Sequence, residues 1–232
     1  MIRHRAAGAA FAALLASTSF AHGPVAASGP LEFEPPAVGS YELPLIQRVP
    51  SGKVMDSAGR RRALDDFTHG RITLLGLVYT RCTDPLGCPR ATWAFNQVRA
   101  RLREMPELES RTRLVTLSFD PVHDNPATLR AYGKRVGATR PGAQWDFLTT
   151  RSKVDLTPIM EGFGQDLRVP RNSRAQPGSE EFMHTLKVFL IDPEGAVREI
   201  YSSAYLIPEI VVNDMATLDT EQVGSAQVGM TR

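Results

Sequence analysis

The residues of this sequence best suited to chemistry are its two cysteines, Cys82 and Cys88, which five residues separate. They lie between an apolar run and the start of a helical pattern, and ligands usually bind at that edge of an α/β sheet. The amides and dipole of a helix start stabilise a thiolate, so we expect a lowered pKa for Cys88. Pro85 and Gly87 let the intervening loop fold back. Both sulfurs are therefore expected to hold one metal ion or to join in a disulfide.

His184 is the candidate third ligand, because it precedes an apolar strand pattern that begins near Leu186. We expect that strand end to lie at the same sheet edge as the cysteines. Two thiolates and one imidazole form a soft ligand set that suits Cu(I) and, with a weak further ligand, Cu(II). A histidine at a strand edge without the cysteine loop would more often be an ordinary hydrogen-bonded residue.

Four other residues are weaker candidates. Asp120 and His123 follow the second apolar run. Either could supply the fourth ligand that zinc requires, or could hydrogen-bond to a metal ligand and orient it. A purely structural role is favoured over metal binding here, because Asp120 and Asp124 are typical turn and cap residues. His22 would chelate copper through its amine and ring if signal cleavage left it at the N-terminus, and His69 has less support still.

An alternation of strand and helix patterns surrounds these residues. The sequence predicts strands over 71–80, 114–119, 145–149, 186–191 and 196–201, and helices over 89–103, 126–136, 152–163 and 208–218. Pro158 is expected in the first turns of its helix or at a kink. This order predicts an α/β domain with a central mixed sheet and helices on both faces, as in a thioredoxin-like fold.

The N-terminus has the pattern of a secretory signal peptide, with two arginines, a short apolar run and small residues. The run is too short to span a membrane, which takes about 20 apolar residues. We expect cleavage near Ala21, alternatively after Ala27, and an exported protein that is soluble afterwards. The expected segments are a signal peptide over 1–21, an extended arm over 22–45, the domain over 46–218 and a C-terminal tail over 219–232.

Charge and motifs exclude two classes of partner. The formal net charge is +2, and removal of the two arginines of the signal brings it to about zero, so no basic excess remains for nucleic acid. No Gly-rich phosphate loop is present, so we expect no nucleotide. The basic run Arg60–Arg62 indicates a solvated turn, or at most an electrostatic patch for an acidic partner.

Between about Ile46 and Leu218 the chain resembles the Sco (SenC) family of copper chaperones for cytochrome oxidase. The motifs that carry the resemblance are Met55–Gly59, Leu64–Phe67, Tyr79–Cys82, Cys88–Pro89, Ser118–Pro121, Asp124–Pro126, His184 and Phe189–Gly195. The resemblance implies a thioredoxin-like fold on the periplasmic side, with copper bound by Cys82, Cys88 and His184. It also implies delivery to an acceptor cuproprotein, such as the copper centre of a cytochrome c oxidase subunit.

Two features depart from the family pattern. The family normally has three residues between the cysteines, whereas this chain has five. The signal peptide looks cleavable, whereas many relatives keep a membrane anchor. Because function belongs to a site rather than to a fold, the acceptor does not follow from the resemblance alone.

Two other classes of function compete with copper delivery. In a thiol-disulfide oxidoreductase, one cysteine would attack a partner disulfide and the other would resolve it, although the usual spacing is two residues. In a non-catalytic binding module, the cysteines would form a permanent disulfide. Copper binding itself requires reduced cysteines, so a thiol reductant is an expected partner.

Overall fold

The computed structural model describes residues 34–165 and 186–230, so the expected signal peptide, His22 and His184 lie outside the described residues. The strands are β1 (Gln47–Arg48), β2 (Lys53–Asp56), β3 (Arg61–Ala63), β4 (Ile72–Val78), β5 (Thr112–Ser118), β6 (Gln144–Thr149), β7 (Lys187–Ile191) and β8 (Ala196–Ser202). The helices are α1 (Asp65–Thr68), α2 (Cys88–Leu102), α3 (Pro106–Arg111), α4 (Pro126–Arg135), α5 (Lys153–Gly162) and α6 (Pro208–Met230).

The strands form one eight-stranded sheet in the order β1-β8-β7-β4-β5-β6-β2-β3. β4, β5 and β6 run parallel, while β7 is antiparallel to β4 and β2 is antiparallel to β6. The mixed sheet that the sequence predicts is therefore confirmed. Because β4 and β5 are parallel with Val78 opposite Ser118, the loops that follow them leave the sheet side by side.

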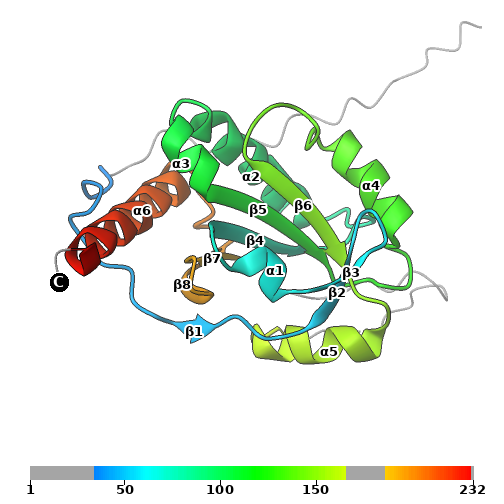
Figure 1. Cartoon of the computed structure of the whole chain (residues 1–232). Helices are drawn as coiled ribbons and strands as arrows, with labels where there is room; N and C mark the ends of the chain where they lie inside the picture. Colours follow the sequence, from blue (N-terminus) through cyan, green and yellow to red (C-terminus); the bar gives the residue numbers. More distant parts are fainter. Residues whose placement is uncertain (1–33, 166–185, 231–232) are drawn as a thin grey trace, which may run out of the picture.

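Helices cover both faces of this sheet, as predicted (Figure 1). α2 and α4 lie behind the sheet in that view, and α1 and α5 lie in front. α2 approaches β4 closely at Gly76, where an added Cβ would lie 3.1 Å from the Phe95 ring. α2 and α4 are joined by hydrogen bonds from Asn96 to the Val136 carbonyl and between Thr92 and Tyr132.

Several features differ from the prediction. β1, β2, β3 and α1 were not among the predicted elements, since each has four residues or fewer. α6 continues to Met230 rather than ending near Leu218, and ion pairs of Asp219 with Arg111 and of Glu221 with Arg198 hold its extension. α3 was not predicted, since its six residues have no apolar periodicity. The basic run Arg60–Arg62 belongs to β3 and the turn before it, because the backbone pairs with β2 there.

The interior of α5 contains Pro158, and the helix continues through it from Lys153 to Gly162. Ser152 caps its start by accepting a hydrogen bond from the Asp155 amide at 3.2 Å. Within residues 34–165 and 186–230, no helix is long and apolar enough to cross a membrane.

Arg99 holds α2 against the loop between α4 and β6. Its buried guanidinium donates hydrogen bonds to the carbonyls of Gly137, Ala138, Arg140 and Ala143 at 2.7–3.3 Å. A guanidinium has five N–H donors in a fixed plane, so it can satisfy several carbonyls of one loop at once. This contact fixes the helix that begins at Cys88.

We predict that Arg99→Met lowers the free energy of unfolding by about 3 kcal/mol, because it leaves buried carbonyls without donors. Denaturant unfolding monitored by circular dichroism measures the change. The matched control is Arg103→Met, an exposed position just after the same helix, where we expect a change within about 0.5 kcal/mol. Equal effects of the two substitutions would contradict this role of Arg99.

Candidate metal centre

The loop between β4 and α2 brings the two cysteines together. It turns through a hydrogen bond from the Cys82 amide to the Tyr79 carbonyl at 3.2 Å, and a second from the Gly87 amide to the Asp84 carbonyl at 3.0 Å. An added Cβ at Gly87 would lie 3.4 Å from Cys82 Sγ and 3.1 Å from Asp84 Oδ2. Gly87 therefore leaves room beside its backbone for the side chains of Asp84 and Cys82. The predicted fold-back of the loop is confirmed.

Both cysteines are free thiols, and their environments differ. Cys88 is buried with 1% of its surface exposed, whereas Cys82 is half-buried. A hydrogen bond from the Cys88 thiol lowers the pKa of Cys82 to about 6, with help from the backbone N–H groups of Cys88 and Asp84. The same hydrogen bond, together with burial, raises the pKa of Cys88.

The expectation of a lowered pKa at Cys88 is therefore wrong, although the helix start does stabilise a thiolate. The backbone N–H at the start of α2 reaches the sulfur of Cys82, which lies in front of the helix. Cys88 itself is the first residue of α2 and lies in the core, where burial favours its neutral form. The pair thus combines one accessible thiolate with one buried thiol.

Asp124 is a buried carboxylate that ties the end of β4 to the end of β5. It accepts hydrogen bonds from the amide and hydroxyl of Thr80 at 2.9 and 2.5 Å, and from the Ser118 hydroxyl at 2.6 Å. Asp124 was expected to be a turn or cap residue, but the cap of α4 is its neighbour Asn125, which accepts from the Thr128 amide. Asp124 instead holds the residue two positions before Cys82.

Asp120 and His123 bond to each other and to Arg81 rather than to the cysteines. The buried Asp120 carboxylate lies 3.0 Å from Arg81 Nη2 and 2.9 Å from His123 Nδ1. Burial alone would raise the pKa of Asp120, but the hydrogen bonds and charges of His123 and Arg81 lower it. Within residues 34–165 and 186–230, no three His, Cys, Asp or Glu side chains form a group that could hold a metal ion.

The other histidines of the sequence occupy different places. His69 precedes β4, at the end of that strand opposite to Cys82, and it packs against Gly195 in the turn between β7 and β8. It is therefore excluded from a site with the sulfurs. His22 and His184 lie outside the described residues. Leu186, which is described and buried, immediately precedes β7, and Val188 of β7 lies opposite Gly76 of β4.

A pocket of about 320 Å³ opens beside the cysteines, between α2 and α4. Both sulfur residues line it together with Trp93, Tyr132 and Arg135. The sequence analysis missed this pocket because its walls come from two helices about 40 residues apart, and no local pattern connects them. The only signal was the pairing of polar Thr92 and Tyr132 on helix faces, which becomes visible once the helices are packed.

Exposed apolar side chains lie on the loops around the cysteines. Leu86 in the cysteine loop is 66% exposed, Tyr205 after β8 is 72% exposed, and Val122 in the turn after β5 is 64% exposed. The Ser203 hydroxyl donates to the Leu86 carbonyl at 2.7 Å, which joins the loop after β8 to the cysteine loop. This apolar rim of Leu86, Val122 and Tyr205 is suited to contact with another protein.

This chain is similar in sequence to a family model and in structure to several solved proteins. A family model described as SCO1/SenC matches residues 51–218. No curated protein matches the sequence. Among solved structures, a SCO1/SenC family lipoprotein from Bacillus anthracis str. Ames is similar, with a TM-score of 0.63 and 24% identity over 76% of this chain and 97% of that one.

Two further structures share the fold. ScoI of Arabidopsis thaliana, solved with copper bound, has a TM-score of 0.61 and 15% identity over 75% of this chain and 99% of that chain. BsSco is a member of the Sco family of cytochrome c oxidase assembly proteins, and a disulfide switch was identified in it. It has a TM-score of 0.61 and 20% identity over 78% of this chain and 98% of that chain. The predicted thioredoxin-like fold is thereby confirmed.

We predict that alkylation of Cys82 by iodoacetamide follows a titration with a midpoint near pH 6, because the thiolate is the reactive form. The rate should fall below that pH and level off above it. Cys88→Ala, which removes the hydrogen-bond donor, should move the midpoint up towards about 8.5, the usual cysteine value. Cys88→Ser is the matched control, since its hydroxyl still donates, and a midpoint unaffected by either substitution would contradict the assignment.

We predict that Asp124→Ala lowers the free energy of unfolding by about 2–4 kcal/mol, because buried donors on two strand ends lose their acceptor. Asn125→Ala, which removes only the helix cap beside it, should cost about 1 kcal/mol. Chemical denaturation of both variants measures the difference. If Asp124→Ala cost no more than the loss of the cap, Asp124 would not be the tie between β4 and β5.

Proposed function

The chain belongs to the SCO1/SenC family, and from that premise we propose that it captures copper through Cys82, Cys88 and His184 and delivers it to an acceptor cuproprotein. The observation that carries the proposal is the pair of free thiols that the β4–α2 loop holds in hydrogen-bond contact. The copper bound by the Arabidopsis relative supports it. Copper is here the cargo of the protein rather than a resident cofactor.

The two described donors fit Cu(I). Soft thiolates select Cu(I), and metal ligands bind in their deprotonated form. Cys82 supplies a thiolate near neutral pH, whereas Cys88 has to lose its proton when copper binds. The metal would then replace the proton that the two sulfurs share. This exchange makes the copper affinity depend on pH.

His184 is the proposed third ligand. It lies two residues before Leu186, which the structure places just before β7, the strand antiparallel to β4. Two residues span at most about 7 Å, so the chain direction at Leu186 supports a position near the end of β4. The described residues supply no third donor of their own, which gives His184 a role that Asp120 and His123 do not fill.

Transfer to an acceptor would occur at the apolar rim of Leu86, Val122 and Tyr205. Contact there would bring the acceptor's ligands beside the half-exposed sulfur of Cys82, from which copper could pass by stepwise ligand exchange. The description of BsSco as a member of a family of cytochrome c oxidase assembly proteins supports an acceptor in that oxidase. We also propose that the protein works in the periplasm after removal of its signal peptide.

A second candidate function is thiol-disulfide exchange, which the difference between the two thiols favours. The Cys82 thiolate would attack one sulfur of a partner disulfide, forming a mixed disulfide and releasing one partner thiolate. Cys88, once deprotonated, would attack Cys82 and release the second. The partner disulfide would thus be reduced to two thiols while Cys82 and Cys88 become a disulfide, which a thiol reductant would have to reduce again. A permanent structural disulfide would allow neither reaction.

We predict that the reduced full-length mature chain binds one Cu(I) in an anaerobic titration against a competing chelator. Cys82→Ser, Cys88→Ser and His184→Ala should each weaken the affinity by more than tenfold, because each removes a donor. His69→Ala is the matched control, since this histidine lies at the other end of β4, and it should leave the affinity unchanged.

Weak binding that His184→Ala leaves unchanged would refute the three-ligand site. Reduction of a model disulfide by the wild-type protein, lost in Cys82→Ser, would then support thiol-disulfide exchange. Absence of both activities would favour the binding module.

A further inference from the structure

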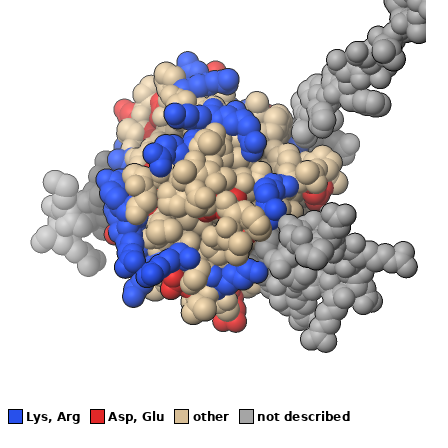
Figure 2. All heavy atoms as spheres, turned by 90° about the vertical axis from the view of Figure 1, so that its right-hand side faces the viewer, with Lys and Arg blue, Asp and Glu red and all other residues tan. Residues whose placement is uncertain are grey.

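The edge of the sheet formed by β3 carries the second functional surface that we infer. β3 is the last strand of the sheet and pairs with β2 on one side, while no strand of the described chain pairs with its other side. Figure 2 shows the molecule from the right-hand side of Figure 1, where β2 and β3 lie, and lysine and arginine side chains cover more of this face than acidic side chains do. An edge strand with unpaired backbone groups is a template for an added strand.

The register of β3 identifies the backbone groups available there. The Asp56 amide donates to the Arg60 carbonyl at 3.1 Å, and hydrogen-bonded pairs alternate along an antiparallel ladder. Arg62, opposite Val54, therefore forms a hydrogen-bonded pair with β2. Arg61 consequently directs its N–H and C=O away from β2, towards the open edge.

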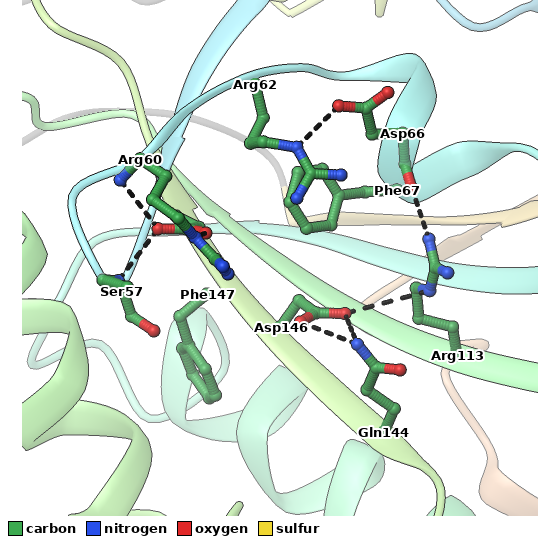
Figure 3. A pocket seen from close by; sticks show the side chains of 11 residues that line it. Ser57, Arg60, Arg62, Asp66, Phe67, Arg113, Gln144, Asp146 and Phe147 are labelled. Atoms are coloured by element: carbon green, nitrogen blue, oxygen red, sulfur yellow. Dashed lines mark hydrogen bonds and ion pairs between the residues drawn. The ribbon is translucent and has the colours of Figure 1, made fainter.

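Two pockets adjoin this edge. One of about 180 Å³ lies between the β2–β3 turn and the strands β5 and β6, and Arg60, Arg62 and Arg113 reach into it from different sides (Figure 3). The other, of about 600 Å³, is lined by Lys53, Arg61 and other residues of β2, β3 and the start of α5. Arg62 and Asp66 line both, so the pockets are neighbours along the edge.

The aspartates of these pockets already have partners. Asp56 accepts from Arg60 Nε at 2.7 Å, and Asp66 accepts from Arg62 Nε at the same distance. Asp146 accepts from the Gln144 amide at 2.8 Å. Asp155 forms a hydrogen bond with the Ser152 hydroxyl at 3.2 Å. The acidic groups are thus occupied within the protein.

The cations retain unused donors. Arg60 and Arg62 hydrogen-bond through Nε, and within the described chain their terminal nitrogens make no hydrogen bond. The side chains of Lys53, Arg61 and Arg151 have no hydrogen-bond or ion-pair partner among these residues, and all three are exposed. The planar fork of arginine matches the two oxygens of a carboxylate.

We propose that the β3 edge, with the two pockets beside it, binds an extended, carboxylate-rich segment of a partner protein. The segment would add a strand through the outward backbone groups of Arg61, and its acidic side chains would meet the unpaired guanidinium and ammonium groups. Main-chain pairing with side-chain pockets is a recurrent way in which proteins bind extended peptides.

An acidic peptide suits this surface better than an anionic membrane does. A lipid surface would favour apolar side chains beside the basic ones. The exposed large apolar side chains of residues 34–165 and 186–222 include none that lines either pocket. The edge strand offers directional hydrogen bonds, which a peptide can use and a headgroup layer cannot.

This surface is separate from the cysteines, so the proposal does not rest on copper binding. β3 lies four strands away from β4 in the sheet, or roughly 19 Å at about 4.8 Å per strand. A partner could hold the edge while the apolar rim at the cysteines remains accessible.

The test uses a fluorescein-labelled ten-residue peptide of alternating glutamate and threonine, titrated with the full mature chain in low salt and followed by fluorescence anisotropy. We expect saturable binding that the double variant Arg61→Glu with Arg151→Glu weakens at least tenfold. Arg103→Glu, the same charge reversal at an exposed position after α2, should change the affinity less than twofold. Circular dichroism melting curves confirm that each variant is folded.

A second pair of variants tests the strand itself. Arg61→Thr removes the charge but keeps the outward N–H, whereas Arg61→Pro removes both, and an edge strand tolerates proline there. We expect Arg61→Pro to bind the peptide at least threefold more weakly than Arg61→Thr. Equal affinities of the two variants for the peptide would overturn the proposal that the peptide adds a strand to the sheet.

Lack of peptide binding, or binding that charge reversal leaves unchanged, would overturn the proposal. Binding to phosphatidylglycerol vesicles but not to the peptide would replace it with a membrane surface. Cu(I) affinity measured on the same variants should be unchanged, so a failed copper site and a failed docking site give different results.

Discussion

The pairing of β4 with its two neighbours is the constraint on which the rest of the structure depends. All seven residues of this strand are buried, and it lies parallel to β5 and antiparallel to β7. A strand covered on both faces has to be apolar throughout, and its register decides where the next polar loop leaves the core. The chain leaves the core at Thr80, whose amide and hydroxyl donate hydrogen bonds to the buried carboxylate of Asp124. These bonds fix the direction in which the cysteine loop begins.

In the cysteine pair, burial and hydrogen bonding give two chemically identical thiols different pKa values. Burial favours the neutral thiol at Cys88, and the hydrogen bond that this thiol donates favours the charged form at Cys82. A low-coordinate copper site and a disulfide exchange site both need this arrangement, since each needs two sulfurs in contact. What separates the two functions is a third donor, and in this chain that donor is the proposed His184.

The two surfaces that we assign use different physical chemistry. The cysteine site has a soft, half-buried sulfur, and the exposed residues of the apolar rim, Leu86, Val122 and Tyr205, lie on the loops near it. The β3 edge has exposed cations, and the aspartates that line its two pockets are already bonded. Apolar contact suits a brief transfer complex, whereas charge increases the rate of encounter and orients the partner. The copper delivery that we propose would benefit from this separation of the two surfaces.

The sequence by itself determined the alternation of strands and helices, the loop that carries Cys82 and Cys88, and the family, because apolar periodicity and motif spacing are local properties. It missed β1, β2, β3, α1 and α3, which are too short to show a period. It also missed the part of α6 beyond Leu218, which tertiary ion pairs support. Only the tertiary structure decided which cysteine holds the thiolate. That choice depends on burial and on the direction of one hydrogen bond, and neither can be read from spacing alone.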